Sequence, residues 1–174
     1  TLGMCPVNGE EGYWVRVRIE KGDFGVPGSY ENVDDRWVWQ DERPLRPPVL
    51  KRLMLKSTEE ASPFSRVLTF NDWCYNDETS VAAMESQEFQ AFTPVPEESP
   101  TLFLGFSDKF PERDTHLYVR LVEDLDIGMD RELGEQSIVW EFWDGREWSG
   151  LLPRDETYGL TRSGFVHFKG PKSL

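Results

Sequence analysis

Glycine and proline recur along the whole of this chain, and they leave room only for short structural elements. The 174 residues include 14 glycines and 12 prolines, residue types that mark turns and interrupt helices. Between them lie short runs in which apolar and polar residues alternate, which is the pattern of half-buried strands. Only residues 79–88 tolerate a helix, so we expect helix in less than about 15% of the chain.

The alternating runs predict about seven short strands. The first covers residues 13–19, with tyrosine, valine and isoleucine on one face and tryptophan and arginine on the other. Further strands are expected at residues 49–56, 67–70, 102–106, 117–122, 138–143 and 165–168. The runs 102–106 and 117–122 are joined by a polar turn, and we expect them to pair as a hairpin.

A long segment between the first two strands, residues 22–48, is rich in glycine, proline and charge, and we interpret it as a loop. Trp37 and Trp39 share one side of an extended chain, which allows a short edge strand within it. The whole pattern predicts an all-β, antiparallel fold with little helix, either a β-sandwich or a Greek-key, jelly-roll-like barrel.

For the domain organisation, we expect residues 1–30 to hold a strand and a linker, or the end of a preceding module. Residues 31–174 are then expected to form the β-sandwich module. The sequence starts with Thr1 rather than methionine, which suggests a longer parent protein or a trimmed end.

The net charge disfavours two classes of partner. Lysine and arginine number 19 against 32 acidic residues, a formal charge of −13 at pH 7. Such a chain repels nucleic-acid phosphates and anionic lipid surfaces, so we expect neither nucleic-acid binding nor membrane insertion. Cys5 and Cys74 lack a CxxC spacing and predict free thiols rather than a zinc site or a disulfide framework.

Residues with catalytic potential are few. His116 and His167 are the only histidines, and no GxSxG-like motif supplies a nucleophile beside either of them. Nothing singles out one carboxylate pair among the many acids for glycoside hydrolysis. We therefore predict that the chain is not an enzyme and carries no catalytic residues.

Residues 123–136 form an acidic segment, hereafter the acidic loop. Within it, residues 124–135 partly follow the spacing of a calcium-binding loop. However, Met129 stands where the sharp turn of such a loop needs glycine, and no helices flank the segment. We expect a solvated loop, with no bound metal and no cofactor.

The aromatic segment around Asp144 and Gly145 predicts a β-hairpin. A two-residue loop would place Trp143 opposite Arg146, and a four-residue loop would place it opposite Trp148. In both registers Trp140 faces the core side and Trp143 the other side. Trp140 is therefore expected in the core, where large aromatics contribute most. Trp143 and Trp148 are candidates for contact with a partner protein or a sugar.

A second set of residues follows this hairpin. Asp155 and Thr157 are placed to hydrogen-bond within a turn. Residues 161–164, including Thr161 and Gly164, are expected to form the turn before the last strand. Arg162 is expected to pair with an acidic neighbour.

Residues 138–168, with the sequence IVWEFWDGREWSGLLPRDETYGLTRSGFVHF, resemble a segment of baseplate assembly proteins of the baseplate J-like class. The matching positions are Trp140, Glu141, Trp143, Asp144, Gly145, Trp148, Asp155, Thr157 and Leu160 to Gly164. Residues 12–25, 66–77 and 102–121 are similar to upstream segments of the same family. The resemblance therefore covers most of the chain.

This resemblance implies a structural role without catalytic residues. The family belongs to contractile phage tails and phage-tail-like injection particles, and its members are longer than this chain, which would then be one internal module. The implied partners are other baseplate and tail proteins, and the isolated module is expected to be a monomer or a weak oligomer. Assembly is expected in the cytoplasm, followed by incorporation into the particle or virion. The alternative is a carbohydrate- or surface-binding module that uses the aromatic hairpin, residues 140–148.

Overall fold

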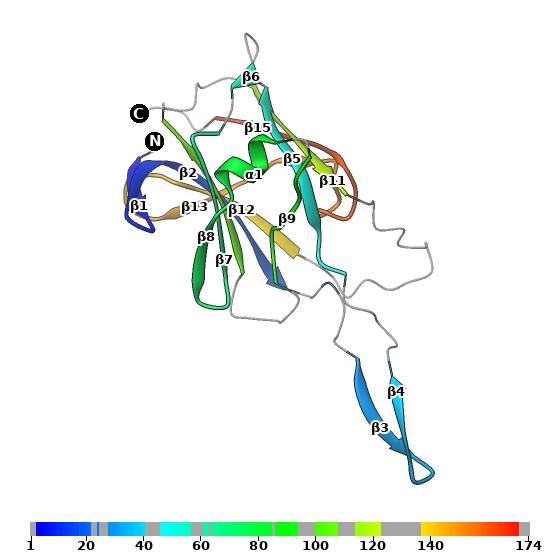
Figure 1. Ribbon diagram of the computed structural model, residues 1–174. Helices are drawn as coiled ribbons and strands as arrows, with labels where there is room; N and C mark the ends of the chain where they lie inside the picture. Colours follow the sequence, from blue (N-terminus) through cyan, green and yellow to red (C-terminus); the bar gives the residue numbers. More distant parts are fainter. Residues whose placement is uncertain are drawn as a thin grey trace.

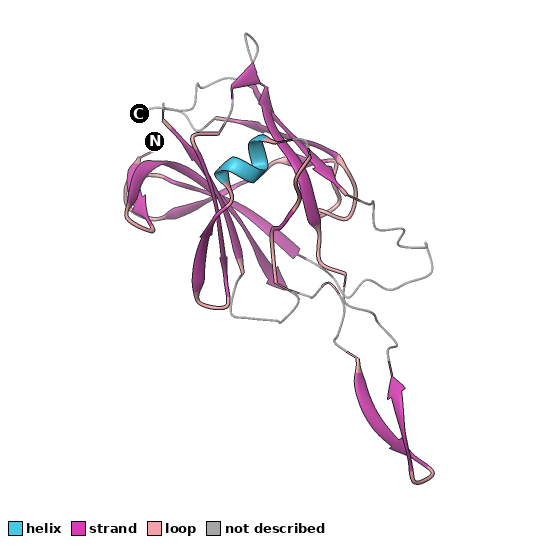
Figure 2. Cartoon of the chain, viewed as in Figure 1, coloured by secondary structure: helices cyan, strands magenta, loops and turns pink. Residues whose placement is uncertain are grey.

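Thirteen of the fifteen described strands assemble into two antiparallel sheets whose inner faces share one hydrophobic core (Figure 1, Figure 2). The computed structural model describes residues 3–21, 24, 28–40, 46–56, 61–62, 64–84, 86–93, 100–107, 114–122 and 137–170. Over these residues 63% of the chain is strand and 4% is helix. The expected antiparallel all-β sandwich with little helix is therefore confirmed.

The larger sheet has seven strands, in the order β13-β12-β2-β10-β7-β8, with β1 beside β2. Its strands are β1 (Met4–Val7), β2 (Glu10–Lys21), β7 (Arg66–Asn71), β8 (Cys74–Asp77), β10 (Thr101–Phe106), β12 (Ser137–Trp143) and β13 (Trp148–Leu151). β10 pairs along one edge of β2, while β1 and β12 share the other edge. Because β2 lies inside the sheet, residues 10–21 belong to the sandwich rather than to a preceding module or linker.

The smaller sheet has six strands, in the order β14-β15-β11-β5-β6, with β9 beside β5. Its strands are β5 (Val49–Lys56), β6 (Ala61–Ser62), β9 (Phe89–Gln90), β11 (Asp114–Leu121), β14 (Arg154–Asp155) and β15 (Gly164–Lys169). All seven predicted strands are present, and the additional ones have two to five residues. The described residues hold fifteen strands rather than about seven, because two- to five-residue strands carry too few side chains to show a periodic pattern.

The predicted hairpin of residues 102–106 and 117–122 is wrong. β10 lies in the larger sheet between β2 and β7, whereas β11 lies in the smaller sheet between β5 and β15. The chain therefore crosses from one sheet to the other between these strands. Both strands present apolar side chains to the same core, and a crossover satisfies that pattern as well as a hairpin does.

Alternation along the strands decides which side chains enter the core. β2 directs Val15 and Val17 inward, and β12 adds Trp140. The smaller sheet contributes side chains such as Leu117 and Val166, each at most 1% exposed. The only helix in the described part, α1 (Thr79–Ala83), contacts both β5 and β7 and so bridges the two sheets. It is shorter than the predicted segment 79–88.

The segment expected to be a long loop contains a third, two-stranded sheet. β3 (Ser29–Val33) and β4 (Arg36–Gln40) pair only with each other. Figure 1 shows this hairpin projecting from the body of the molecule. The allowed edge strand at Trp37 and Trp39 is thus half of a separate hairpin, and the interpretation of residues 22–48 as a loop is wrong for residues 29–40.

Candidate functional site

The aromatic hairpin of β12 and β13 adopts the register with the four-residue loop. Trp143 lies directly opposite Trp148, and Trp140 lies opposite Leu151. The two opposed indole rings meet edge to face, with ring centroids 5.7 Å apart and an interplanar angle of 70°. Of the two registers left open by the sequence, only this one brings the two tryptophans into contact.

Asp144 closes the turn of this hairpin. Its Oδ1 accepts hydrogen bonds from the backbone N–H groups of Arg146 (2.8 Å) and Glu147 (3.0 Å), and its Oδ2 accepts one from the Ser149 hydroxyl (2.9 Å). The backbone donors hold the pKa of Asp144 below its ordinary value. Gly145 has φ of +105°, a conformation that a side chain would disfavour. The Asp-Gly pair therefore has a structural role.

The three tryptophans of the hairpin divide between two faces, as expected. Trp140 is 3% exposed and belongs to the core between the sheets. Trp143 and Trp148 are half-buried on the outer face of the larger sheet. The indole nitrogens of Trp140 and Trp143 are buried without a hydrogen-bond partner among the described residues. The core position of Trp140 is confirmed, whereas Trp143 and Trp148 are neither fully buried nor open to solvent.

The outer face of the larger sheet is itself an aromatic cluster. Its buried members are Val7, Trp14, Leu68 and Phe103, packed against the partly buried Cys5, Phe70, Tyr75 and Trp148. Trp14 is only 1% exposed, and its indole N–H donates to the carbonyl of Cys5 at 3.1 Å. Side chains from neighbouring strands thus cover one another on this face.

Charged groups complete the cover of this face. The Arg16 guanidinium lies over the ring of Trp148, 4.2 Å from its centroid. Glu141 accepts hydrogen bonds from Nε of Arg16 at 2.8 Å and from Nε of Arg18 at 2.9 Å. Burial by itself would raise the pKa of Glu141, but the two guanidinium groups outweigh this effect and the pKa falls below its ordinary value.

The second matched segment, residues 155–164, forms a hydrogen-bonded turn before β15. Asp155 Oδ1 accepts from the backbone N–H of Thr157 at 2.7 Å and from its hydroxyl at 2.6 Å. The backbone N–H of Thr161 donates to the carbonyl of Thr157 at 3.0 Å. A Cβ at Gly164 would lie 2.9 Å from the carbonyl oxygen of Glu156, so the close approach of these backbones requires glycine. The predicted turn is confirmed.

Arg162 binds its acidic neighbour in an unexpected way. Its Nε donates to the backbone carbonyl of Glu156 at 3.0 Å, and its guanidinium lies 4.0 Å from the centroid of the Tyr158 ring. Arg162 therefore binds the main chain of Glu156, whereas the carboxylate of Glu156 contacts Arg154 and His167. The hydrogen bond from Arg162 thus connects the end of the turn to its beginning.

The hairpin β3–β4, hereafter the arm, has a face of solvent-exposed aromatic side chains. Tyr30 lies opposite Trp39, and Asn32 lies opposite Trp37, so these four side chains share one face. Tyr30 is 64% exposed, Trp37 is 70% exposed and Trp39 is 52% exposed. The arm turns through two residues with positive φ, Asp34 and Asp35, which suits a tight hairpin.

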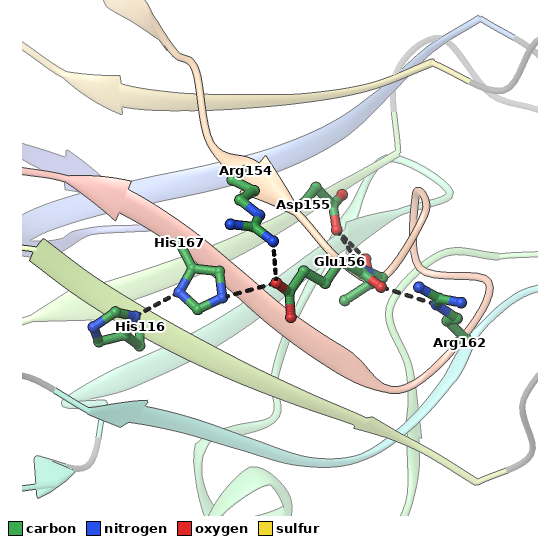
Figure 3. A network of polar contacts seen from close by, with 7 residues as sticks. His116, Arg154, Asp155, Glu156, Arg162 and His167 are labelled. Carbon is green, nitrogen blue, oxygen red and sulfur yellow. Dashed lines mark hydrogen bonds and ion pairs between the residues drawn. The ribbon is translucent and has the colours of Figure 1, made fainter.

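A polar network lies on the outer face of the smaller sheet, and Figure 3 shows its members. His116 and His167 occupy directly opposed positions of β11 and β15, and their Nδ1 atoms are 2.6 Å apart. Nε2 of His167 faces Oε1 of Glu156 at 3.4 Å, and the same oxygen pairs with Arg154 at 3.3 Å. These two histidines, hereafter the histidine pair, thus share one network.

Sequence reasoning allowed the strand at Trp37 and Trp39 but missed its partner β3, and it missed the histidine pair. The arm carries a readable signal, because alternating runs flank Asp34 and Asp35, but the aspartate pair is weaker than an Asn-Gly turn. No local signal announces the histidine pair. His116 and His167 are 51 residues apart, and only the pairing of β11 with β15 brings them together.

Comparisons with protein-family models, with curated proteins and with solved structures found no match. In the described residues, no group of three or more histidine, cysteine or acidic side chains is arranged to hold a metal ion. The same residues contain no helix long and apolar enough to cross a membrane. The acidic loop, with its partial calcium-loop spacing, lies outside the described residues.

Proposed function

We propose that this chain is a structural module of a baseplate component in a contractile phage tail or tail-like injection particle, and that it acts through protein–protein assembly. The arm is the observation that carries the assembly role. The baseplate setting rests on the resemblance of residues 138–168 and of the upstream segments. The two parts of the proposal can therefore be tested separately.

The arm has the physical properties of a docking element. A two-stranded hairpin by itself is marginally stable in water, because it has little apolar surface to bury. Here Tyr30, Trp37 and Trp39 remain largely exposed, and none of them belongs to the core clusters. Contiguous exposed aromatics of this kind are enriched at protein interfaces. The fitting partner is a neighbouring subunit with an apolar groove that covers this face.

The sandwich behaves as the scaffold for this arm. Asp144, Gly145, Asp155, Thr161 and Gly164 match the family pattern, and each supports a turn. A pattern made of turn-forming residues describes a folding unit. This supports the structural role that the resemblance implies.

The first test concerns the baseplate setting and uses the genes that flank this one. We expect genes for a tail sheath, a tube and a spike beside it. A neighbourhood without tail genes would contradict the baseplate setting, but it would leave the assembly role of the arm open to the second test.

The second test concerns the arm, in the full-length parent protein expressed with its neighbouring tail genes. The double variant Trp37→Ala/Trp39→Ala is compared with Val38→Ala, which alters the opposite face of the same strand. Purified particles are expected to contain at least about tenfold less of the double variant, because buried tryptophans dominate interface energies. The control should be incorporated like the wild type. Equal incorporation of both variants would contradict a docking role for the arm.

The alternative is a carbohydrate- or surface-binding module that uses Trp143 and Trp148. Sugar platforms need open ring faces, whereas Trp148 is covered by Arg16 and the two indoles meet edge to face. This geometry favours assembly. Glycan binding that is lost in Trp143→Ala and Trp148→Ala, and retained in the arm variant, would replace the present proposal with the alternative.

A further inference from the structure

The histidine pair places two imidazole Nδ1 atoms 2.6 Å apart, an arrangement that no sequence motif announces. We propose that His116 and His167 bind a divalent transition-metal ion through their Nδ1 atoms, with Cu²⁺ and Ni²⁺ favoured over Zn²⁺. Imidazole is a preferred ligand of these ions. The inference is independent of the assembly role.

The Glu156 carboxylate beside His167 prepares Nδ1 of this histidine for metal binding. The Glu156 carboxylate can only accept, and it faces Nε2 of His167 at 3.4 Å. This favours the tautomer with the proton on Nε2 and the lone pair on Nδ1. Metal-binding histidines commonly have such a carboxylate at the far ring nitrogen. Arg154 pairs with the same carboxylate and orients it.

The short contact between the two rings is then a hydrogen bond between their Nδ1 atoms. With the lone pair of His167 Nδ1 directed at His116, the 2.6 Å separation requires that Nδ1 of His116 donate its proton. An incoming metal ion takes the place of this proton. The displaced proton moves to Nε2 of His116, so the tautomer of His116 changes, both Nδ1 lone pairs become ligands, and the neutral pair releases no net proton.

The separation of the nitrogens determines which ions fit. With metal–nitrogen bonds of about 2.05 Å, two neighbouring positions of a square or octahedral site lie about 2.9 Å apart, and two tetrahedral positions lie about 3.3 Å apart. The observed 2.6 Å must open by about 0.3 Å for the first geometry and by about 0.7 Å for the second. Cu²⁺ and Ni²⁺ adopt the first geometry, and Cu²⁺ also binds most tightly in the general affinity order.

The surroundings allow this adjustment. Both imidazoles are half-buried on the outer face of the sheet, and the ring of Phe165 stacks against His167 with centroids 5.6 Å apart. Since the described residues offer no cluster of three metal-binding side chains, water is expected to fill the remaining positions. The result is an open, two-histidine site rather than a closed structural one.

Calorimetric titration of the protein with copper, nickel and zinc chlorides tests the proposal. The Cys74→Ser background removes an exposed thiol that would compete for these ions. One equivalent of Cu²⁺ or Ni²⁺ should bind, and the neutral histidine pair should release no net proton, measured in buffers of different ionisation enthalpy. His116→Asn or His167→Asn should weaken binding by more than about tenfold, and Glu156→Gln by about tenfold. Asp114→Asn, on the same face of β11, is the matched control and should leave the affinity unchanged.

Two results would overturn the proposal: no binding at millimolar metal, or equal affinity in the wild type and His167→Asn. Melting temperatures measured with a chelator verify that the variants are folded. If a variant is unfolded, electron paramagnetic resonance of Cu²⁺ bound to the protein with both histidines intact decides whether the site exists. Hyperfine coupling to two imidazole nitrogens is expected, and coupling to one or none would overturn the site.

Discussion

Replacement of Trp140 by alanine is the most informative single test of the sandwich. Trp140 is 3% exposed, and it contacts the core shared by the two sheets. Truncation of a buried large aromatic removes its transfer free energy and leaves a cavity that the surroundings fill only partly. We expect Trp140→Ala to lower the free energy of unfolding by about 3–5 kcal/mol. For a domain of this size that corresponds to a melting temperature lower by roughly 10 °C.

The buried indole nitrogen of Trp140 refines this expectation. It has no hydrogen-bond partner among the described residues, and an unpaired buried donor costs about 1–3 kcal/mol. Trp140→Phe removes this donor and keeps most of the ring. Its loss of stability should therefore be clearly smaller, within about 2 kcal/mol. Comparing the two variants separates the packing contribution from the unpaired donor.

Urea denaturation followed by far-ultraviolet circular dichroism provides the measurement, with Trp143→Ala as the matched control. Trp143 lies on the opposite face of the same strand and is half-buried, so its truncation should cost only about 1 kcal/mol. A loss below about 1 kcal/mol for Trp140→Ala would refute the core assignment. The hypothesis of an aromatic platform for carbohydrate would then become the leading one.

Three further predictions concern acid stability, thiol reactivity and calcium. The folded pKa of Glu141 lies below its ordinary value of 4.5, so its ion pairs with Arg16 and Arg18 stabilise the fold above that pH. This contribution is lost as the pH falls through the lower folded pKa. In urea titrations, the free energy of unfolding of Glu141→Gln should therefore fall less steeply with decreasing pH than that of the wild type, and an equal pH dependence would contradict the pairing. Burial raises the pKa of Cys5 to about 11, although Arg16 opposes the shift, so a disulfide reagent at mildly alkaline pH should react quickly only with the exposed Cys74. Rapid reaction of both thiols with the reagent would show that Cys5 is accessible. Millimolar calcium should leave the melting temperature unchanged, and a rise of many degrees that a chelator reverses would reveal a site in the acidic loop.

Sequence reasoning was most reliable where neighbouring residues decide the structure. The alternation of residues 13–19 placed Val15 and Val17 inward and Arg16 outward, as β2 has them. The Asp144-Gly145 turn followed from residue chemistry, because an aspartate carboxylate and a glycine satisfy the turn within a few residues. Side-chain period and turn chemistry are local properties, and no distant partner is needed to read them.

Only the tertiary structure decided which strands pair. β10 and β11 are neighbours along the chain, yet they lie in different sheets, because each had an apolar face that either pairing could bury. No local sequence pattern indicated that the arm would pair with neither of the two larger sheets.

The amino-acid sequence by itself therefore determined the strand pattern, the low helix content, the core position of Trp140 and the turns around Asp144 and Asp155. The tertiary structure decided the crossover between the sheets, the exposure of Trp37 and Trp39, and the meeting of His116 with His167. The physical reason is that strand pairing depends on the free energy of the whole core rather than on a nearby pattern. A register between strands far apart along the chain leaves no periodic trace in either of them.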